Sequence, residues 1–329
     1  MERWTAEVID RLAALAPERY VVAQPRPRFR RRAGAQAWEQ LALPAAAARH
    51  HAALVFSPAN LAPLAWPRNV LVMHDAAVLR EPHAYSRAYR AWHRTAGLTC
   101  ARRARAVITV SEFSRRELIA VAGLDPQRLT VISGGVDDRF SPQSAASRAP
   151  VAARLGLTRP YVLTIAAADD RKNLGALAPV AHRLDALGID LAWAGDTRPH
   201  FAGAGEPPAS LRRLGYVDDG DLPALYAGAL AFVLPSRYEG FGLTCLEAMA
   251  SGIPVVAADR AALPETCGDA ALLVDPDDGP ALAAAVSAAA TDDTVRDRLR
   301  AAGPRRAATF TWDRAAAATH ALLMELAGD

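Results

Sequence analysis

Between Pro235 and Val256 the chain reads Pro-Ser-Arg-Tyr-Glu-Gly-Phe-Gly-Leu-Thr-Cys-Leu-Glu-Ala-Met-Ala-Ser-Gly-Ile-Pro-Val-Val. The apolar run Ala229–Leu234 precedes this stretch and predicts a buried strand. Residues 242–251 have the composition of a helix, which Gly252 and Pro254 end. The predicted order is therefore strand, glycine-rich turn and helix.

The turn and the start of this helix hold groups that suit a phosphorylated sugar. The first N–H groups of a helix lack intrahelical partners and lie at the positive end of the helix dipole, so they bind phosphate. Gly240 and Gly242 allow the backbone to approach a ligand closely. Glu239 and Glu247 supply carboxylates that accept hydrogen bonds from the hydroxyls of a sugar or a ribose. These groups predict a nucleotide-sugar site; the alternative is a structural turn and a surface helix with two solvated carboxylates.

Short apolar runs alternate with helical segments along most of the chain. The expected strands are Arg19–Ala23, Ala53–Phe56, Asn69–His74, Ala106–Val110, Leu129–Ile132, Tyr161–Ala166, Asp190–Ala194, Leu211–Val217, Ala229–Leu234, Pro254–Ala258 and Ala271–Val274. Such alternation predicts parallel sheets covered by helices, and its occurrence twice predicts two Rossmann-like domains. The Ser-, Pro- and Ala-rich stretch Asp137–Pro160 is the expected linker, which gives an N-terminal domain in residues 1–150 and a C-terminal domain in residues 151–310. Ligands of such folds bind at the carboxyl ends of the strands, so the site is expected in the cleft between the domains.

The stretch 235–256 resembles the signature of the retaining glycosyltransferases of family 4 (glycosyl transferases group 1), which have the GT-B architecture of two Rossmann-like domains facing each other across a cleft. Its two glutamates match Glu239 and Glu247, and Leu-Pro-Glu-Thr at 263–266 adds to the likeness. The resemblance implies that Glu239 contacts the donor sugar and that Glu247 binds the ribose of the nucleotide. The turn and helix start between them are implied to bind the donor too: Gly240, Phe241, Gly242 and Leu243.

A basic pair follows the strand expected at Tyr161–Ala166, where Asp169-Asp170-Arg171-Lys172-Asn173-Leu174 opens a helix expected at Asn173–Leu187. Cations are disfavoured at a helix start by the dipole, so an anionic partner such as a diphosphate is expected. The family has Arg-Lys-Asn-Leu here, which implies that Lys172 and Arg171 hold the donor pyrophosphate and stabilise the leaving group. The alternative is a solvated helix start. A departure is Ala166-Ala167-Ala168, where the family often has glycine; the added methyl groups bear on donor affinity.

Two further positions are implied by the resemblance. His74 and Asp75 stand at the end of an expected strand, where the family has His-Asp or His-Glu. The resemblance implies that His74 lies near the anomeric centre or a donor phosphate and that Asp75 orients it, although a lone histidine is more often structural. In that position His74 could donate a hydrogen bond to developing charge. Gly215-Tyr216-Val217 is similar to the element that flanks the nucleobase, which makes Val217 an expected donor contact through its backbone.

The N-terminus departs from the family pattern. Residues 3–15 predict an amphipathic helix, with Trp4, Val8, Ile9, Leu12 and Leu15 on one face. The family usually begins with a strand and a glycine-rich turn before this helix, and neither precedes it here. Either the start codon lies too far downstream or the N-terminal domain lacks the first, central strand of its sheet, which would expose two sheet edges. The helix expected at Thr311–Leu326 is implied to pack back on the N-terminal domain, so that residues 311–329 join it.

Composition limits the remaining classes of protein. Of the 329 residues, 51% are apolar and 22% are charged, which is typical of a globular protein. A charged N-terminus, the lack of an apolar run of about 20 residues, and three cysteines without metal-ligand spacing predict a cytoplasmic protein. Asp219-Gly220-Asp221 has the pattern of a metal site in a different glycosyltransferase architecture, but Asp221 is better interpreted as the N-cap of a helix at Leu222–Ala227. No metal and no cofactor are expected.

Arginines and aromatic residues are interleaved in two parts of the first half. The residues concerned are Arg26, Arg28, Arg30, Arg31 and Arg32, and then Arg87, Arg90 and Arg94 beside Tyr85, Tyr89 and Trp92. They suit the inner face of an anionic membrane, where each cation contributes about 1 kcal/mol, and a solvated basic loop is the alternative. The net charge of +3 and the lack of a recognition motif do not support a nucleic-acid partner.

The resemblance therefore implies a retaining, metal-independent enzyme that moves a hexose from a nucleoside diphosphate sugar to a hydroxyl of a saccharide or lipid-linked saccharide, in cell-surface polysaccharide or glycolipid assembly. Its catalytic residues would be His74, Glu239 and Lys172, and the leaving diphosphate would take the proton of the acceptor. Two alternatives stay open: a sugar-nucleotide epimerase, and a GT-B-like scaffold that only binds a nucleotide sugar or a partner transferase.

Overall fold

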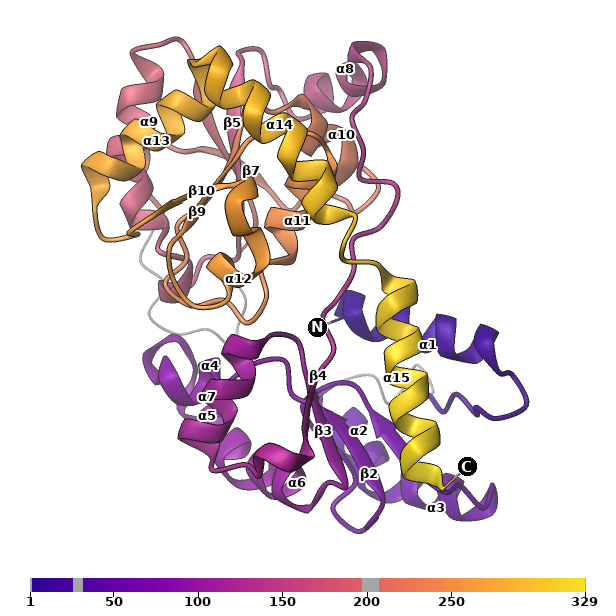
Figure 1. The fold of residues 1–329 in the computed structure, drawn as a ribbon. Helices are drawn as coiled ribbons and strands as arrows, with labels where there is room; N and C mark the ends of the chain where they lie inside the picture. Colours follow the sequence, from indigo (N-terminus) through magenta and orange to yellow (C-terminus); the bar gives the residue numbers. More distant parts are fainter. Residues whose placement is uncertain (1, 26–31, 197–206, 329) are drawn as a thin grey trace. The chain divides into compact units, whose positions relative to one another are not determined.

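The computed structural model describes residues 2–25, 32–196 and 207–328, which form two compact units (Figure 1). The first unit consists of Met1–Arg80, Arg87–Gly135 and Trp312–Asp329, and the second of Glu81–Ser86 and Val136–Thr311. Each unit contains one sheet of parallel strands with helices packed on it, so the predicted α/β class with two Rossmann-like domains is confirmed.

The second unit begins earlier in the chain than the expected boundary at residues 150/151. The Val136 N–H donates to the carbonyl of Phe310 (3.1 Å), and Phe140 is buried in the core of the second unit. The helix α8 (Ala145–Arg154) packs on α10 (Leu222–Gly228). Apolar contacts therefore attach most of the expected linker to the second unit, although its Ser-, Pro- and Ala-rich composition resembles that of a loop.

The first unit has a four-stranded sheet in the order β1-β2-β3-β4. Its strands are β1 (Val55–Ser57), β2 (Asn69–Val72), β3 (Ala106–Thr109) and β4 (Leu129–Val131). Its helices are α1 (Glu2–Leu15), α2 (Arg32–Ala37), α3 (Leu43–Arg49), α4 (Ala77–Arg80), α5 (Arg87–Trp92), α6 (Leu98–Arg103), α7 (Glu112–Ala122) and α15 (Trp312–Ala327), with π-helical turns at Trp38–Ala42 and His93–Gly97 and a 3₁₀ turn at Pro126–Arg128. β2 and β3 are buried along their whole length, which explains their continuous apolar sequences.

The prediction of a strand at Arg19–Ala23 is wrong. Residues 20–25 have no regular structure, and the first strand among the described residues is β1. Val21 and Val22 are 64% and 45% exposed, so this apolar pair has no buried sheet face on which to pack. The sheet is nevertheless continuous, and its two edge strands among the described residues are β1 and β4.

The two terminal helices pack on each other within the first unit, as Figure 1 shows for α1 and α15. Trp4, Val8 and Leu12 are buried on the predicted apolar face of α1, whereas Leu15 at its end is 55% exposed. Arg11 Nε bonds Asp313 Oδ1 at 2.7 Å, and the Tyr20 hydroxyl bonds His320 Nδ1 at 2.6 Å. The last helix therefore packs on the first helix within the first unit.

The second unit has a six-stranded parallel sheet in the order β10-β9-β8-β5-β6-β7. Its strands are β5 (Tyr161–Ile165), β6 (Asp190–Ala194), β7 (Arg212–Gly215), β8 (Phe232–Leu234), β9 (Val255–Ala258) and β10 (Leu272–Val274). Besides α8 and α10, its helices are α9 (Ala178–Asp185), α11 (Leu243–Ala250), α12 (Leu263–Cys267), α13 (Gly279–Thr291) and α14 (Asp293–Ala307), with 3₁₀ turns at Pro82–Ala84, Asp170–Lys172, Leu174–Leu177 and Gly268–Ala270.

The order of these strands creates a switch point between β5 and β8. From β5 the chain builds β6 and β7 on one side, and it then returns to build β8, β9 and β10 on the other side. β5 and β8 are paired in parallel at Leu163 and Phe232, so the loops that follow them leave neighbouring strands in opposite directions. Ligands of open α/β sheets bind in the crevice that such loops form.

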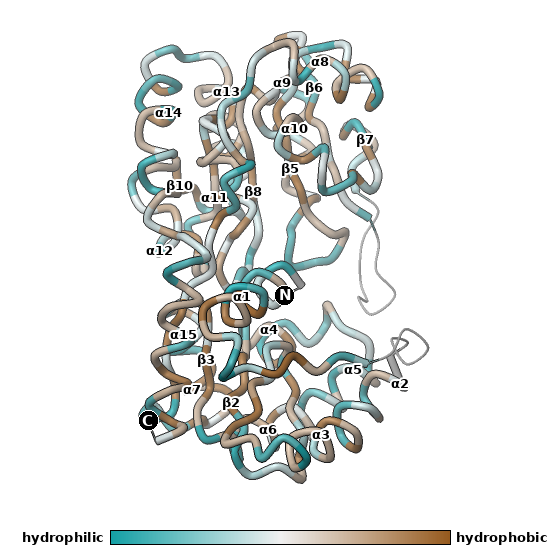
Figure 2. Tube along the Cα trace, turned by 90° about the vertical axis from the view of Figure 1, so that its right-hand side faces the viewer, coloured by the Kyte–Doolittle hydropathy of each residue, from teal (hydrophilic) through white to brown (hydrophobic). Residues whose placement is uncertain are grey.

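The core of the second unit lies on both faces of its sheet. Leu163 and Phe232 belong to one apolar cluster, and Val162 and Val233, their neighbours in the chain, belong to the cluster on the other face. Figure 2 shows hydrophobic colouring along β5 in this unit and along β2 and β3 in the first unit. Among the described residues, no helix is both long and apolar enough to span a membrane.

Candidate functional site

The loop after β5 carries the predicted basic pair in a tight 3₁₀ turn. The Asp169 carboxylate accepts from the backbone N–H of Arg171 (3.0 Å) and caps the turn Asp170–Lys172. Asn173 closes it in the left-handed conformation (φ 53°) and donates to the carbonyl of Pro276 (3.0 Å). The helix expected to start at Asn173 therefore begins only with α9, because Asn173 turns the chain first.

Arg171 and Lys172 leave this turn toward different partners. The Arg171 guanidinium is nearly buried, bonds Asp169 Oδ2 at 3.1 Å and lies over the Tyr85 ring at 5.4 Å. Lys172 Nζ lies 2.6 Å from Glu239 Oε1. The Arg171 side chain therefore holds the turn together, while that of Lys172 faces the loop after β8. Binding of a pyrophosphate by Arg171 stays a prediction.

Two contacts join the loops after β5 and β8. The Arg237 N–H donates to the Arg171 carbonyl at 2.7 Å, and the ion pair of Lys172 with Glu239 lies beside it. Burial of Glu239 raises its pKa, but the charge and hydrogen bond of Lys172 and the charge of Arg171 outweigh this effect, so that the pKa of Glu239 is lowered. Glu239 is therefore an ionised hydrogen-bond acceptor at neutral pH.

The glycine-rich turn has a conformation that requires glycine at one position. Gly242 has φ +99°, and a Cβ atom there would lie 2.7 Å from Leu263 Cδ2. The Thr266 hydroxyl donates to the carbonyl of Phe241, and the Ala262 N–H donates to that of Glu239 (3.3 Å). These contacts give the sequence Leu-Pro-Glu-Thr at 263–266 a structural role, because α12 holds the turn from behind.

The helix α11 begins directly after this turn and carries the second glutamate. Glu247 is only 3% exposed, and its Oε2 accepts a hydrogen bond from the Tyr226 hydroxyl at 2.9 Å. The Glu239 side chain is 12% exposed. Because neither carboxylate is solvated, the alternative of a surface helix with two solvated glutamates is wrong.

The other expected donor contacts also follow the carboxyl ends of strands in the second unit. Gly240, Phe241, Gly242 and Leu243 form the turn and the first residue of α11. Phe241 packs edge-to-face on Phe310 (5.6 Å between ring centroids). Val217 follows β7, and its side chain lies in the core cluster, which leaves its backbone for any contact with a ligand.

His74 belongs to the first unit, where it follows β2. Its backbone N–H donates to Asn60 Oδ1 (3.0 Å), and its ring lies edge-on to Trp4 (5.7 Å). Burial lowers the pKa of His74 to about 3, so the ring is neutral. Nε2 lies 3.1 Å from the carbonyl of Pro58, which can only accept, so Nε2 carries the proton and Nδ1 the lone pair.

This arrangement changes the expected chemistry of two residues. The N–H of the His74 ring is directed to Pro58, so the ring offers a hydrogen-bond acceptor and not the expected donor. The expectation that Asp75 orients His74 is wrong in this structure, because Asp75 Oδ1 accepts from the Ala77 N–H (2.8 Å) at the start of α4.

The acidic pair in the loop before α10 also has partners of its own. Asp219 bonds Arg139 and Asp221 bonds Arg154, each at 2.5 Å. Asp221 occupies the N-cap position of α10, but its side chain makes no capping hydrogen bond, since it is drawn to Arg154. In the described part of the chain, no group of three or more His, Cys, Asp or Glu residues is arranged to hold a metal ion.

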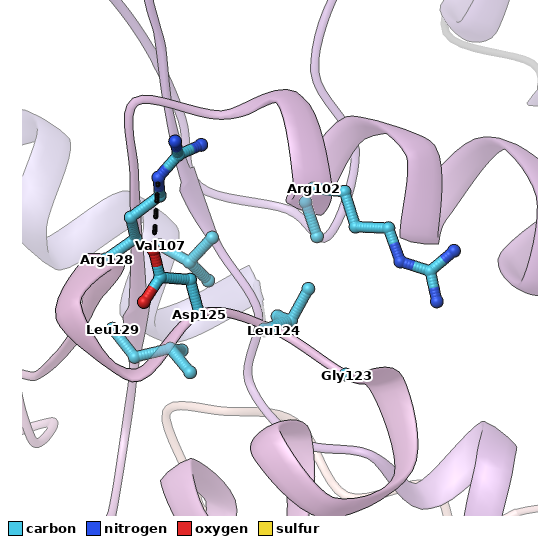
Figure 3. Close-up of a pocket in the computed structure, with 8 residues that line it drawn as sticks. Arg102, Val107, Gly123, Leu124, Asp125, Arg128 and Leu129 are labelled. Carbon is cyan, nitrogen blue, oxygen red and sulfur yellow. Dashed lines mark ion pairs between the residues drawn. The ribbon is translucent and has the colours of Figure 1, made fainter.

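Two small hollows lie at the amino-terminal ends of strands, whereas the loops of the switch point follow the carboxyl ends. One of about 250 Å³ is in the first unit, where Figure 3 shows Arg102, Asp125 and Arg128 around the residues that precede β3 and β4. Another of about 180 Å³ lies in the second unit at the start of β6 and β7. Both are at amino-terminal strand ends, so neither coincides with the switch point.

The structure describes only some of the basic and aromatic residues expected to form a membrane-binding face. Residues 26–31, which include Arg26, Arg28, Arg30 and Arg31, lie outside the described residues. Tyr85 is buried in the second unit beneath Arg171, so it is not part of an exposed basic face. Arg87 and Arg94 are exposed.

Comparison with known proteins agrees with this geometry. Residues 4–140 match the family Glycosyltransferase Family 4, and residues 159–292 match the family Glycosyl transferases group 1. The O-antigen chain mannosyltransferase B of Escherichia coli is 36% identical over 64% of this chain and 58% of its own length. The chain thus spans a little more than half the length of this curated relative.

Solved structures share the fold. Sucrose-phosphate synthase from Thermosynechococcus elongatus superimposes with a TM-score of 0.69 at 24% identity, over 87% of this chain and 76% of its own. The Anabaena protein Alr3699/HepE in complex with UDP and glucose gives a TM-score of 0.66 at 21% identity, over 78% of this chain and 71% of its own. The fold class, the two matched families and the paired glutamates agree: the chain belongs to the family 4 glycosyltransferases (glycosyl transferases group 1), which have the GT-B architecture.

Proposed function

We propose that the chain transfers a hexosyl group from a nucleoside diphosphate sugar to a hydroxyl of a saccharide, with retention of anomeric configuration and without a metal ion. The observation that carries the proposal is the convergence of Lys172, Glu239, the N-terminus of α11 and Glu247 at the switch point between β5 and β8. Lys172 and the helix start supply positive charge, and the two carboxylates supply acceptors for hydroxyl groups. A nucleotide sugar combines both requirements.

The relatives guide the choice of substrates. Mannose is the proposed sugar because the Escherichia coli relative is an O-antigen chain mannosyltransferase. A nucleotide donor is supported by the Anabaena structure, which holds UDP and glucose. A saccharide acceptor, free or lipid-linked, in polysaccharide or glycolipid assembly is proposed on the same grounds.

The proposed roles follow from the position of each group in the second unit. Lys172 and the N–H groups at the start of α11 stabilise the charge of the departing diphosphate. Glu239 accepts from hydroxyls of the sugar, and Glu247 accepts from the ribose. The diphosphate takes the proton of the acceptor hydroxyl on the face that it leaves, so no nucleophile from the protein takes part. In the first unit, we propose that Nδ1 of His74 accepts a hydrogen bond from a substrate hydroxyl.

Contact with an anionic membrane surface is part of the proposal. Arg87 and Arg94 are exposed cations at the start of α5 and in the π-helical turn that follows it. Each is expected to contribute about 1 kcal/mol to binding near an anionic surface. Sedimentation with vesicles of phosphatidylcholine alone, or with added phosphatidylglycerol, tests this part: Arg87→Ser/Arg94→Ser should weaken binding to the anionic vesicles only.

The experiment that tests the proposal measures sugar transfer directly. The protein is incubated with GDP-mannose, UDP-glucose or ADP-glucose and a panel of mannosides, with and without EDTA, and the anomeric configuration of the product is read by NMR. Formation of an α-linked product from an α-linked donor, unaffected by EDTA, supports the proposal. Conversion of the donor without an acceptor would identify an epimerase, and nucleotide binding without turnover would identify a scaffold.

A further inference from the structure

A buried tyrosine hydroxyl lies against one of the two glutamates. Tyr226 on α10 is fully buried, and its hydroxyl donates to Glu247 Oε2 on α11 at 2.9 Å. Its ring is packed edge-to-face on Phe140 (5.7 Å between centroids) and against Phe232 of β8 (5.6 Å). Aromatic neighbours on two sides fix the ring, so the hydroxyl has one defined position.

Glu247 is a carboxylate at a nearly dry position. It is 3% exposed, and a buried carboxylate is costly unless hydrogen bonds stabilise its charge. A phenol O–H that donates to one oxygen stabilises the charged form and fixes the plane of the group. The second oxygen is then held in a defined direction, where it can accept from a ligand.

We propose that Tyr226 is a positioning residue that fixes the Glu247 carboxylate for the 2′- and 3′-hydroxyls of a ribose, and thereby sets the preference of the site for a ribonucleotide over a deoxyribonucleotide. This inference rests on the proposed function, since it assumes that the site binds a nucleotide. Tyr226 lies outside the strand–turn–helix signature, and its proposed effect is on the ribose of the ligand only. Loss of the hydroxyl lets the carboxylate rotate, so affinity for the ribose hydroxyls falls while contacts with the diphosphate persist.

The same core offers a matched control. Tyr161 at the start of β5 is also buried in this apolar cluster, and its hydroxyl donates to the carbonyl of Leu225 on α10 at 2.7 Å. Tyr161→Phe therefore removes one buried hydroxyl and one hydrogen bond to α10, as Tyr226→Phe does, but leaves Glu247 with its partner. Equal losses of thermal stability in the two variants would show that they are comparable.

The experiment is calorimetric titration with UDP, GDP and ADP and with the 2′-deoxy and 3′-deoxy counterpart of whichever nucleotide binds. Five proteins are compared: wild type, Tyr226→Phe, Tyr161→Phe, Glu247→Gln and the double variant Tyr226→Phe/Glu247→Gln. We expect wild type and Tyr161→Phe to prefer the ribonucleotide by roughly tenfold to a hundredfold, the usual range for hydrogen bonds to a charged group. Tyr226→Phe should reduce this preference by about an order of magnitude, and Tyr226→Phe/Glu247→Gln should show no smaller preference than Glu247→Gln alone.

Each other outcome overturns the inference. A full ribose preference in Tyr226→Phe shows that the hydroxyl does not position Glu247. An equal loss in Tyr161→Phe shows that the effect spreads through the core. A wild-type protein that binds ribo- and deoxynucleotides equally removes the ribose role of Glu247 while leaving nucleotide binding in place. Failure of the wild type to bind any of the three nucleotides overturns the proposed function itself, which separates the two failures.

Discussion

Lys172 Nζ and Glu239 Oε1 lie 2.6 Å apart, so the cation and the carboxylate at the switch point form one ion pair between the loops after β5 and β8. The side chains are 18% and 12% exposed, which makes the pair more than a surface contact. Lys172 therefore keeps Glu239 ionised and in place, and we propose that it also binds the phosphate of the donor.

The first prediction concerns turnover. Glu239→Gln and Lys172→Ala should each lower the rate of sugar transfer by on the order of a hundredfold, because each removes a group that stabilises the reacting donor. Arg159→Ala is the matched control, since Arg159 pairs with Asp185 and Asp190 at the start of β6, which is the opposite end of the strands. Steady-state kinetics, with circular dichroism to verify folding, check this prediction. Near-native rates in either site variant contradict the role assigned to that residue.

The second prediction concerns stability and pH. The pKa of Glu239 is lowered from its ordinary value of 4.5, so the ionised group stabilises the fold above that pH, and the stabilisation is lost as pH falls through the lowered value. In Lys172→Met the cation that offsets the burial of Glu239 is lost, so the pKa of Glu239 should rise. The charged carboxylate then destabilises the fold, and the free energy of unfolding at pH 7 should fall by about 1–3 kcal/mol.

Urea denaturation at pH 7 and at pH 4 measures this difference. The gap between wild type and Lys172→Met should narrow at pH 4, where Glu239 of the variant is protonated. Lys172→Met/Glu239→Gln should be more stable at pH 7 than Lys172→Met alone. A gap that stays the same at both pH values shows that Lys172 contributes packing and not charge.

The third prediction concerns the glycine turn. Gly242→Ala places a Cβ atom 2.7 Å from Leu263 Cδ2 at φ +99°, and should lower the free energy of unfolding by about 1–3 kcal/mol. Gly220→Ala is the control, because open space surrounds that position and its φ is not in the left-handed region; its effect should stay within about 0.5 kcal/mol. Thermal denaturation compares the two. Equal effects would mean that the turn does not depend on glycine at 242.

The fourth prediction concerns His74. Its pKa is lowered to about 3, mainly by burial, from an ordinary value of 6.5, so the unfolded chain binds a proton that the folded chain does not between these values. The free energy of unfolding should therefore decrease as pH falls from 6.5, by up to about 2 kcal/mol at pH 5.

His74→Gln keeps a side-chain N–H for the carbonyl of Pro58 but does not titrate. Its loss of stability between pH 7 and pH 5 should be smaller than that of wild type by most of this amount, as measured by urea denaturation. An identical pH dependence in both proteins would show that burial does not lower the pKa of His74.

The strands β2, β3, β5, β8 and β9 could be predicted because they are parallel and buried on both faces. Their sequences are continuous apolar runs, as at Tyr161–Ile165, and such runs are readable without knowledge of their neighbours. The exception was Arg19–Ala23, where Val21 and Val22 resemble a strand locally. Whether a sheet edge is available to such a segment depends on the rest of the chain, so this error could not be avoided from the sequence.

The site was predictable only where its residues lie within one motif. Glu239, Gly242 and Glu247 share a strand–turn–helix segment, and Lys172 lies in a second one. The left-handed Asn173 was not predictable, because its partner Pro276 lies 103 residues away. Tyr226 was also missed: a tyrosine in an ordinary helix gives no local signal that its hydroxyl meets a carboxylate on the next helix.

Calorimetric titration of the wild-type protein with UDP, GDP, ADP and TDP, beside Glu247→Ala, measures nucleotide binding at this site. Wild type should bind one of these nucleotides, and Glu247→Ala should bind it at least about tenfold more weakly. Absence of binding by the folded wild-type protein, or equal binding by Glu247→Ala, would contradict a nucleotide-sugar site at the switch point between β5 and β8.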